Sequence, residues 1–184
     1  MTLILTVLTG IMYPAIVTAL SQLMFPKQAN GSLISRNGVV IGSDLIGQNF
    51  ARADYFQPRP SAAGNDGYDA TASSGANFGP TSQKLIDRVK TSVDKFHKEN
   101  PDYTGPIPSD LLTASASGLD PHLSVASAQA QIARVAKLRG VPSDQINDLV
   151  NQFVEPRDLG FLGDPRVNVL RLNLALDQKY PAKR

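Results

Sequence analysis

The chain of 184 residues contains no cysteine, no tryptophan and only two histidines, His97 and His122. Without cysteine, neither a disulfide framework nor a thiolate metal site is possible. The two histidines have no partners at ligand-like spacing, so we expect no metal site. The sequence also lacks a G-x-x-x-x-G-K-[ST] phosphate loop and a G-x-G-x-x-G dinucleotide motif, two sequence signals of direct nucleotide binding.

Charge of either sign is dispersed along the chain rather than gathered in one place. Eighteen lysines and arginines stand against sixteen aspartates and glutamates, which gives a net charge of +2. A nucleic-acid-binding protein needs a clustered basic surface, so we expect no nucleic acid as a partner. The length suits one domain, or one domain with a membrane anchor.

No charged side chain occurs between Met1 and Pro26. As a helix, the stretch TLILTVLTGIMYPAIVTALSQLMF would extend about 36 Å, enough to cross a hydrocarbon core of about 30 Å. We predict a transmembrane helix over 1–26 and a soluble domain over 27–184. A cleaved signal peptide and a buried core helix are the alternatives. The long apolar run without a basic segment before it favours a retained anchor.

Small residues recur along this apolar stretch, with Gly10 four positions after Thr6 and Ala19 four after Ala15. Such spacing lets a second helix approach closely, and proline is tolerated in membrane helices. We predict a helix-packing face that comprises Gly10, Pro14, Ala15 and Ala19. The general abundance of small residues in membrane helices is the alternative. The few basic residues after the stretch leave the side of the soluble domain open.

The remaining sequence predicts an α+β domain of short strands, long irregular loops and about three helices. A strand is expected over 37–43, and apolar stripes of helical period predict helices over 81–100, over 121–139 and from an N-cap at Ser143. The segment 55–80 is rich in Gly, Pro and Ser, but its aromatic residues predict an ordered irregular loop. The end of the chain, RVNVLRLNLALD, predicts either a strand with a bulge or a strand that continues into a short helix.

The stretch TASASGLDPHLS (113–124) contains the residue types of a serine hydrolase. A structural interpretation is favoured, because Asp120 before proline is a good helix start and Gly118 permits a sharp turn before it. No G-x-S-x-G nucleophile elbow is present. An anchored hydrolase that uses Ser117 and His122 remains the competing hypothesis.

Gln131 and Arg134 lie three positions apart and share one face of a predicted helix. Together they could hold a phosphate or carboxylate, although a solvated polar face is the simpler interpretation. Arg59, between two prolines, is held in a stiff segment where it either pairs with a partner or braces the loop.

Seven stretches, in order along nearly the whole chain, resemble the KdpC family of the bacterial high-affinity potassium-transporting ATPase, the Kdp complex. They are YPAIVTALSQLMFPKQANGSLI, GSDLIGQNF, YFQPRPSAA, SGANFGPTS, DLLTASASGLDPHLS, QIARVAKLRG and RVNVLRLNLALD. Family members usually begin with polar and basic residues before the span, whereas this chain begins inside it. A trimmed chain or a misplaced start is therefore expected.

The resemblance implies a single-span accessory subunit of a bacterial inner-membrane pump that transports potassium. Its partners would be a channel-like potassium-binding subunit, a P-type ATPase subunit and a small single-helix subunit. The accessory subunit would not itself hydrolyse ATP. It would act as a catalytic chaperone that raises the ATP affinity of the ATPase subunit.

The resemblance also implies which residues carry that role. The family's Q-x-x-R pair falls on Gln131 and Arg134, and its SGG-like segment falls on Ser74 and Gly75, with alanine at the second glycine. The matched stretches single out Tyr55, Phe56, Arg59, Gly118 and Asp120 as structural or partner-contacting positions. The resemblance equally implies an alternative, a gate or filter module outside the cytoplasm at the potassium entrance, where no cytoplasmic ATP can be touched.

Overall fold

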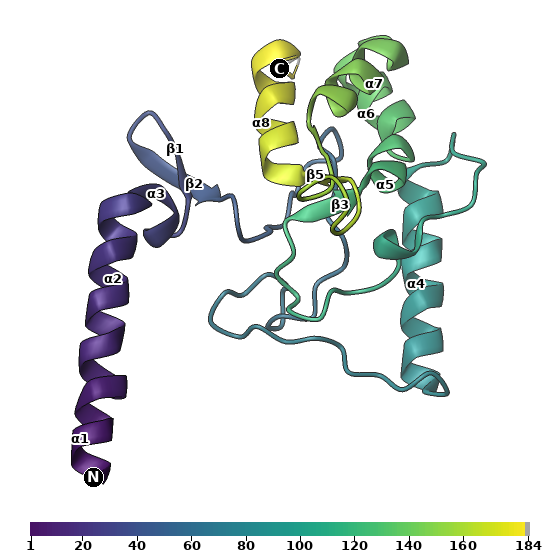
Figure 1. The fold of residues 1–184 in the computed structure, drawn as a ribbon. Coiled ribbons are helices and arrows are strands. Elements are labelled where there is room, and N and C mark those ends of the chain that lie inside the picture. The colour runs from purple at the N-terminus through teal and green to yellow at the C-terminus, as the bar shows by residue number, and fades with distance from the viewer. Residues whose placement is uncertain (183–184) are drawn as a thin grey trace. The chain divides into compact units, whose positions relative to one another are not determined.

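The computed structural model describes residues 1–182. The chain divides into two compact units, of which the first is Met1–Leu45 and the second begins at Ile46. Each unit has its own secondary structure (Figure 1).

The first unit begins with a continuous helix of 23 residues, Thr2–Met24, with a mean hydropathy of 2.1 and no buried residue. By length and composition it can cross a membrane. The helix consists of α1 (Thr2–Val7), a π-helical turn η1 (Leu8–Met12) and α2 (Tyr13–Met24).

The π-helical turn ends at Met12, two residues before Pro14. A proline inside a helix has no N–H to donate, and its ring clashes with the carbonyl four residues earlier, here that of Gly10. A wider π turn accommodates that ring without breaking the helix. Gly10, Pro14, Ala15 and Ala19 are all exposed, and a Cβ added at Gly10 would meet nothing within 4 Å. The predicted packing face is thus uncovered in this chain.

A short helix α3 (Pro26–Ala29) and a β-hairpin complete the first unit. The hairpin pairs β1 (Leu33–Arg36) with β2 (Val39–Ser43) in antiparallel register. Its two turn residues, Asn37 and Gly38, both have positive φ, as the tight turn between two antiparallel strands requires. The strand predicted over 37–43 is confirmed.

The second unit places helices around a small antiparallel sheet of order β3-β5-β4 (Figure 1). Its strands are β3 (His122–Ser124), β4 (Val154–Glu155) and β5 (Arg166–Asn168). Its helices are α4 (Gln83–Glu99), α5 (Val125–Gln129), α6 (Ile132–Arg139), α7 (Ser143–Gln152) and α8 (Val169–Lys179), with a 3-10 turn η2 (Ser109–Leu111). The predicted α+β class is confirmed.

The core of this unit lies between the sheet and helices α5 to α8. Its largest fully buried apolar side chains are those of Phe56, Leu123, Val135, Ile146, Leu149, Val150, Val167, Leu172 and Leu176. Phe56 is contributed by the long segment that contains no helix or strand. That segment is ordered because at least one of its aromatic side chains is buried in the common core.

The helix predicted over 121–139 is wrong in its first part. Residues His122–Ser124 instead pair with β5, and the helix then forms as two pieces, α5 and α6. Asp120 does not cap a helix, because its carboxylate accepts from the N–H of His122 in a tight Asx-type turn. The cap of α5 is Ser124, whose hydroxyl accepts from the N–H of Ser127.

The other predicted elements fit closely. The helix over 81–100 is confirmed as α4, and the C-terminal strand that continues into a helix is confirmed as β5 followed by α8. Ser143 is the first residue of α7 rather than its N-cap, which is Pro142. That prediction is therefore wrong by one position.

Candidate functional site

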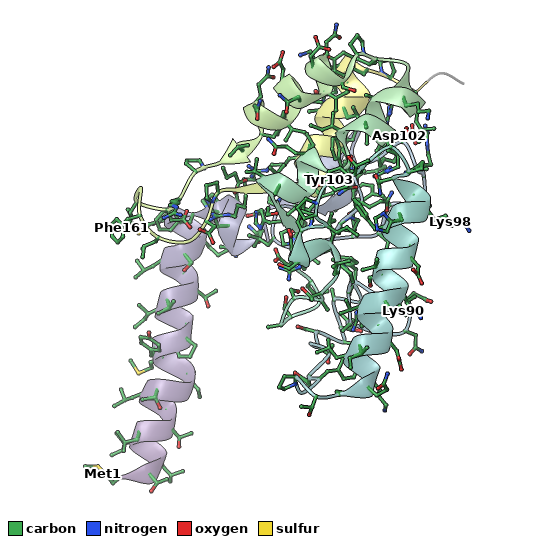
Figure 2. The ribbon with its side chains drawn as sticks, turned by 90° about the vertical axis from the view of Figure 1, so that its right-hand side faces the viewer. Met1, Lys90, Lys98, Asp102, Tyr103 and Phe161 are labelled. Atoms are coloured by element: carbon green, nitrogen blue, oxygen red, sulfur yellow. The ribbon has the colours of Figure 1, made fainter. Side chains whose placement is uncertain are left out.

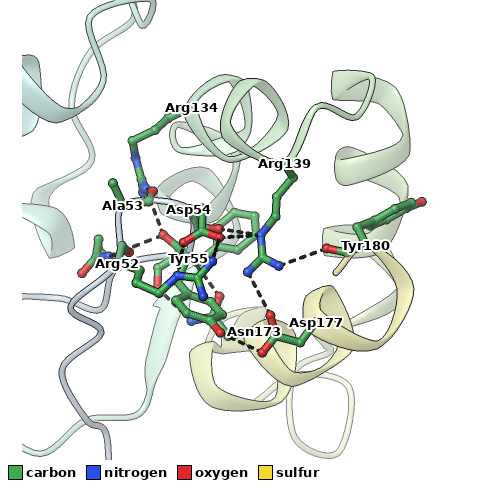
Figure 3. Close-up of polar contacts among 11 residues, drawn as sticks. Arg52, Ala53, Asp54, Tyr55, Arg134, Arg139, Asn173, Asp177 and Tyr180 are labelled. Atoms are coloured by element: carbon green, nitrogen blue, oxygen red, sulfur yellow. Dashed lines mark hydrogen bonds and ion pairs between the residues drawn. The ribbon is translucent and has the colours of Figure 1, made fainter. Parts of the chain in front are cut away.

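The irregular segment Ala53–Gln57, hereafter the 53–57 segment, is held by side chains that bind its backbone. Each of its five residues has a backbone N–H or C=O bound by a side chain from α6, from α8 or from Gln131. Figure 3 shows Arg134 and Arg139 directed at this segment. Buried backbone groups need partners, and in a strand a neighbouring strand supplies them. In the 53–57 segment, side chains supply these hydrogen-bond partners instead.

Two buried amides bind the segment in the same way. The side chain of Asn173 accepts from the N–H of Phe56 and donates to its carbonyl, both at 2.9 Å. The side chain of Gln131 accepts from the N–H of Gln57 at 2.8 Å and donates to its carbonyl at 3.1 Å. Each amide thus copies the exchange of two hydrogen bonds within a residue pair of an antiparallel sheet.

The side-chain amide of Gln131 makes all its hydrogen bonds within the chain. Its Oε1 also accepts from Arg134 Nη2 at 2.6 Å, and its Nε2 also donates to the carbonyl of Ser127 at 3.2 Å. A primary amide offers two acceptor positions and two donors. All four are occupied, and the side chain is 1% exposed. A ligand could reach Gln131 only by displacing one of these partners.

Arg134 connects the 53–57 segment to the end of α4. Its Nη1 donates to the carbonyls of Ala53 and Tyr55, and its Nε donates to Asn100 Oδ1 at 2.9 Å. Burial lowers the pKa of Arg134, and the charges of Glu99 and Asp54 act against that change. An arginine stays cationic under such a shift. Gln131 and Arg134 are therefore brought together as predicted, in contact with each other and with protein backbone.

Arg139, whose side chain is fully buried, anchors the same segment from the end of α6. Its Nε lies 3.1 Å from both the carbonyl and Oδ2 of Asp54, and its Nη2 lies 3.0 Å from Asp177 Oδ1. The guanidinium also lies 4.9 Å from the ring centre of Tyr55, and the Tyr55 hydroxyl donates to Asp177 at 2.7 Å. Tyr55 and Phe56 thus both make contacts within this chain that hold the 53–57 segment.

The charges around Arg139 shift the pKa values of their neighbours. Burial by itself raises the pKa of Asp54, but the hydrogen bonds from Arg52 and the charge of Arg139 bring it below its ordinary value. Burial and the hydrogen bond to Asp177 raise the pKa of Tyr55. Asp54 is therefore a carboxylate at neutral pH, and Tyr55 is a neutral phenol.

A groove of about 670 Å³ adjoins Arg134 and is also lined by Ala53 and Gln57 of the 53–57 segment. It lies between the 53–57 segment, the end of α4 and α6. Its charged lining residues are Lys95, Lys98, Glu99, Asp102, Arg134 and Lys137. Cations outnumber anions there, and Lys98, Asp102 and Tyr103 of its lining are labelled in Figure 2. The groove is large enough for a small organic anion.

Ser74 and Gly75, the other residues predicted for nucleotide, lie apart from the Gln131–Arg134 pair. The N–H of Ser74 donates to the carbonyl of Ser117 at 3.0 Å. A Cβ at Gly75 would come within 2.8 Å of the Ala116 carbonyl oxygen. The close backbone approach at this glycine is therefore to another loop of the same chain. The nucleotide role of these residues stays a prediction.

Arg59, Gly118 and Asp120 form a second, partly buried junction between loops. Arg59 Nη1 donates to Asp120 Oδ2 at 2.9 Å, so Arg59 braces its loop through an ion pair. Gly118 has a φ of +68°, and a Cβ there would lie 2.5 Å from the carbonyl oxygen of Ser74. Burial raises the pKa of Asp120, but hydrogen bonds from His122 and Arg59 bring it below its ordinary value.

The hydrolase hypothesis gains no geometric support. The hydroxyl of Ser117 accepts from the N–H of Leu119 and lies 3.5 Å from the Ser115 hydroxyl. His122 lies between Asp120 and Glu155, with its two ring nitrogens 3.5 Å from a carboxylate oxygen on each side.

Within residues 1–182 no group of three or more metal-ligating side chains comes together.

Sequence reasoning missed Asn100, Arg139, Asn173 and Asp177. A signal was available for Asn173, which is the one uncharged polar residue in the apolar run VLRLNLAL. A lone amide among core leucines usually has a defined hydrogen-bond partner. That partner, the backbone of Phe56, lies too far away in the sequence to be identified from the pattern.

Comparison with known proteins gives consistent matches over nearly the whole chain. The family model of KdpC, described as the K+-transporting ATPase c chain, matches residues 1–178. The chain is 57% identical over 175 residues to the "Potassium-transporting ATPase KdpC subunit" of Myxococcus xanthus, covering 95% of this chain and 82% of the relative. The protein of the same name from Rhodospirillum rubrum is 55% identical over 177 residues, with coverage of 96% and 91%.

Proposed function

The chain belongs to the family of the K+-transporting ATPase c chain, KdpC, and we propose how it serves that potassium pump. It is an accessory subunit of the pump. In our proposal it has a single transmembrane helix in the bacterial inner membrane and does not itself hydrolyse ATP. Its soluble domain lies outside the cytoplasm as a gate or filter module at the potassium entrance, and it makes no direct contact with nucleotide.

The observation that carries this proposal concerns the hydrogen bonds of the Gln131 side chain. All four hydrogen-bonding positions of its amide are occupied within the chain. Arg134 likewise binds two backbone carbonyls and Asn100. If Gln131 or Arg134 turned to bind ATP, the buried polar groups that they now contact would lose their hydrogen-bond partners, which is destabilising. The pair is therefore better suited to fixing the domain's shape than to exchanging a ligand.

The helix Thr2–Met24 supports the anchoring part of the proposal. It is strongly apolar as a whole and unburied in this chain, and its small residues leave a surface that a neighbouring helix can approach. We propose that this neighbour belongs to another pump subunit. The subunits expected as partners are the channel-like potassium-binding subunit, the P-type ATPase subunit and the small single-helix subunit.

The test replaces Gln131 by methionine in the complete pump, with Gln129→Met on the exposed side of α5 as the matched control. We expect Gln131→Met to destabilise the domain by about 2–5 kcal/mol, because both backbone groups of Gln57 lose their partner. Pumps that retain the accessory chain should keep the KM for ATP of the parent. A KM for ATP raised severalfold, with the melting temperature of the accessory chain unchanged, would contradict the proposal.

The catalytic-chaperone role, in which the chain raises the pump's ATP affinity, is the second candidate. The cationic groove beside Arg134 favours it, because Lys95, Lys98 and Lys137 surround a space of suitable size. Lys95→Glu with Lys98→Glu should then raise the KM for ATP. Lys90→Glu, on the same helix but outside the groove's lining, is the control. An unchanged KM in the double variant would leave the first candidate standing.

A further inference from the structure

The loop between β4 and β5 carries an exposed apolar tip, defined here as Leu159, Phe161 and Leu162. Their exposed fractions are 82%, 69% and 50%. Elsewhere in the described part of the second unit, large exposed hydrophobic residues are isolated, namely Phe78, Ile86 and Leu138. Phe161 lies at the outer end of the loop (Figure 2). Three large apolar side chains within four residues form a patch that a monomeric domain rarely leaves in water.

The loop that bears the apolar tip is closed at its base. Asp158 and Leu162 exchange two backbone hydrogen bonds, each of 2.9 Å. Both carboxylate oxygens of Asp158 accept from Arg166, at 3.1 and 3.2 Å. Arg166 belongs to β5, the central strand of the sheet. The tip is therefore held in one shape before any partner binds, which reduces the entropy lost on binding.

The backbone at the apolar tip is strained. Leu159 has a φ of +53°, in the left-handed region that disfavours residues other than glycine and asparagine. Its side chain is almost fully exposed, so packing inside the chain does not compensate for that conformation. Strain of this kind concentrates at sites of binding. The conformation directs a leucine outward at a position where glycine would be more stable.

We propose that the apolar tip inserts into an apolar pocket on another subunit of the potassium pump. This inference rests on the proposed function, because it requires the chain to work within the pump. The three side chains would be the anchors of the contact, in the manner of interface hot spots.

The charges around the tip favour a protein pocket over a lipid surface. Arg157 pairs with Asp164 at 3.1 Å, and Arg166 pairs with Asp158. Arg157 in the loop and Arg166 at the start of β5 are therefore each paired with an aspartate of the loop. A loop that enters an anionic membrane surface is usually helped by unneutralised basic residues. A neutral, preformed tip matches the apolar centre of a protein interface instead.

The experiment compares pumps that carry Phe161→Ser or Leu159→Gly with pumps that carry Ile86→Ser, a matched exposed residue on α4. Each variant is co-expressed with the other subunits and purified through a tag on one of those subunits. We expect Phe161→Ser to weaken retention of this chain by roughly tenfold or more. Leu159→Gly should also weaken retention, although it should raise the melting temperature because glycine suits the positive φ. Ile86→Ser should retain the chain normally.

Normal retention of both tip variants would overturn the inference. So would evidence that the tip enters lipid, which is measurable because the chain has no tryptophan. The full-length Phe161→Trp variant alone, in vesicles of brominated phosphatidylcholine and phosphatidylglycerol, should show no quenching beyond that of an Ile86→Trp control. Strong quenching would assign the tip to the membrane. None of these readouts depends on ATP, so direct ATP binding by the chain would overturn the proposed function and leave the tip contact unaffected.

Discussion

Asn173 on α8 forms two hydrogen bonds with the backbone of Phe56, a residue 117 positions earlier in the chain. This contact ties the long irregular segment to the core at the point where Phe56 is fully buried. Gln131 repeats the arrangement one residue further along, with Gln57. The shape of the domain around α6 and α8 therefore depends on side-chain amides as much as on apolar packing.

Asn173→Leu should destabilise the domain strongly. Leucine keeps a similar volume, but the N–H and C=O of Phe56 both lose their partner in a buried site. We expect a loss of about 2–5 kcal/mol in the free energy of unfolding, measured by urea denaturation of the full-length chain in detergent. Asn151→Leu, on the exposed side of α7, is the control and should change little. Equal stability of the two variants would show that the 53–57 segment is held by packing alone.

Arg139→Met should destabilise the domain by about 3–5 kcal/mol at neutral pH, because it removes a fully buried arginine that pairs with Asp54 and Asp177 and leaves Asp54 with Arg52 alone. The folded-state pKa of Asp54 is below its ordinary value in the parent chain, so the stability from this group is present above the unfolded pKa of about 3.9 and is lost as pH falls through the folded pKa. In the variant, less positive charge opposes the effect of burial, so the pKa of Asp54 is higher than in the parent and its carboxylate takes up a proton more readily. The urea midpoint of the variant should therefore be closer to that of the parent at about pH 4 than at about pH 7. A deficit that is constant with pH would contradict the ion-pair explanation.

Gly118→Ala and Gly160→Ala separate steric contact from backbone conformation. Both glycines have positive φ, +68° and +83°. A Cβ at Gly118 would lie 2.5 Å from the Ser74 carbonyl oxygen, whereas one at Gly160 would meet nothing within 4 Å. We expect losses of about 2–4 kcal/mol at Gly118 and about 1–2 kcal/mol at Gly160 in thermal unfolding. Similar losses at both sites would mean that the loop at Gly118 can move aside.

Gly10→Leu should leave the isolated chain unaffected but impair assembly. The position is open in this chain, so a larger side chain meets nothing. If another helix packs against it, the leucine prevents close approach. We expect lower recovery of the chain with purified pump, whereas the volume-conserving control Ile16→Leu should be recovered as the parent is. Full recovery of Gly10→Leu would remove this position from the packing face.

The elements predicted from sequence are those whose signal is local. The apolar helix follows from 25 residues without a charged side chain before Pro26, and α4 follows from a stripe of helical period that one face of a helix must bury. The α5–α6 region was less predictable, because the same apolar stripe is compatible with one helix or with a short strand and two helices. Residues His122–Ser124 form a strand because they pair with β5, some forty residues later in the chain.

The candidate site was predictable only in part. The spacing of Gln131 and Arg134 placed them on one face, and the structure brings them into contact. Their partners could not be predicted, because Gln57 and Ala53 lie 74 and 81 positions away and contribute backbone atoms. Backbone groups of an irregular segment leave no pattern in the sequence. The same is true of Arg139, whose partners Asp54 and Asp177 come from the two ends of the domain.

The most direct test of the central claim, that the domain works without touching ATP, uses the absence of cysteine from the chain. Lys98→Cys and Lys90→Cys place a thiol on the exposed surface of α4 (Figure 2). Intact cells that express the whole pump are treated with a membrane-impermeant maleimide, and Ile16→Cys within the apolar helix is the unlabelled control. We predict that both surface cysteines are labelled without lysis, which places the domain outside the cytoplasm. Labelling only after lysis would place it beside cytoplasmic ATP and contradict the account.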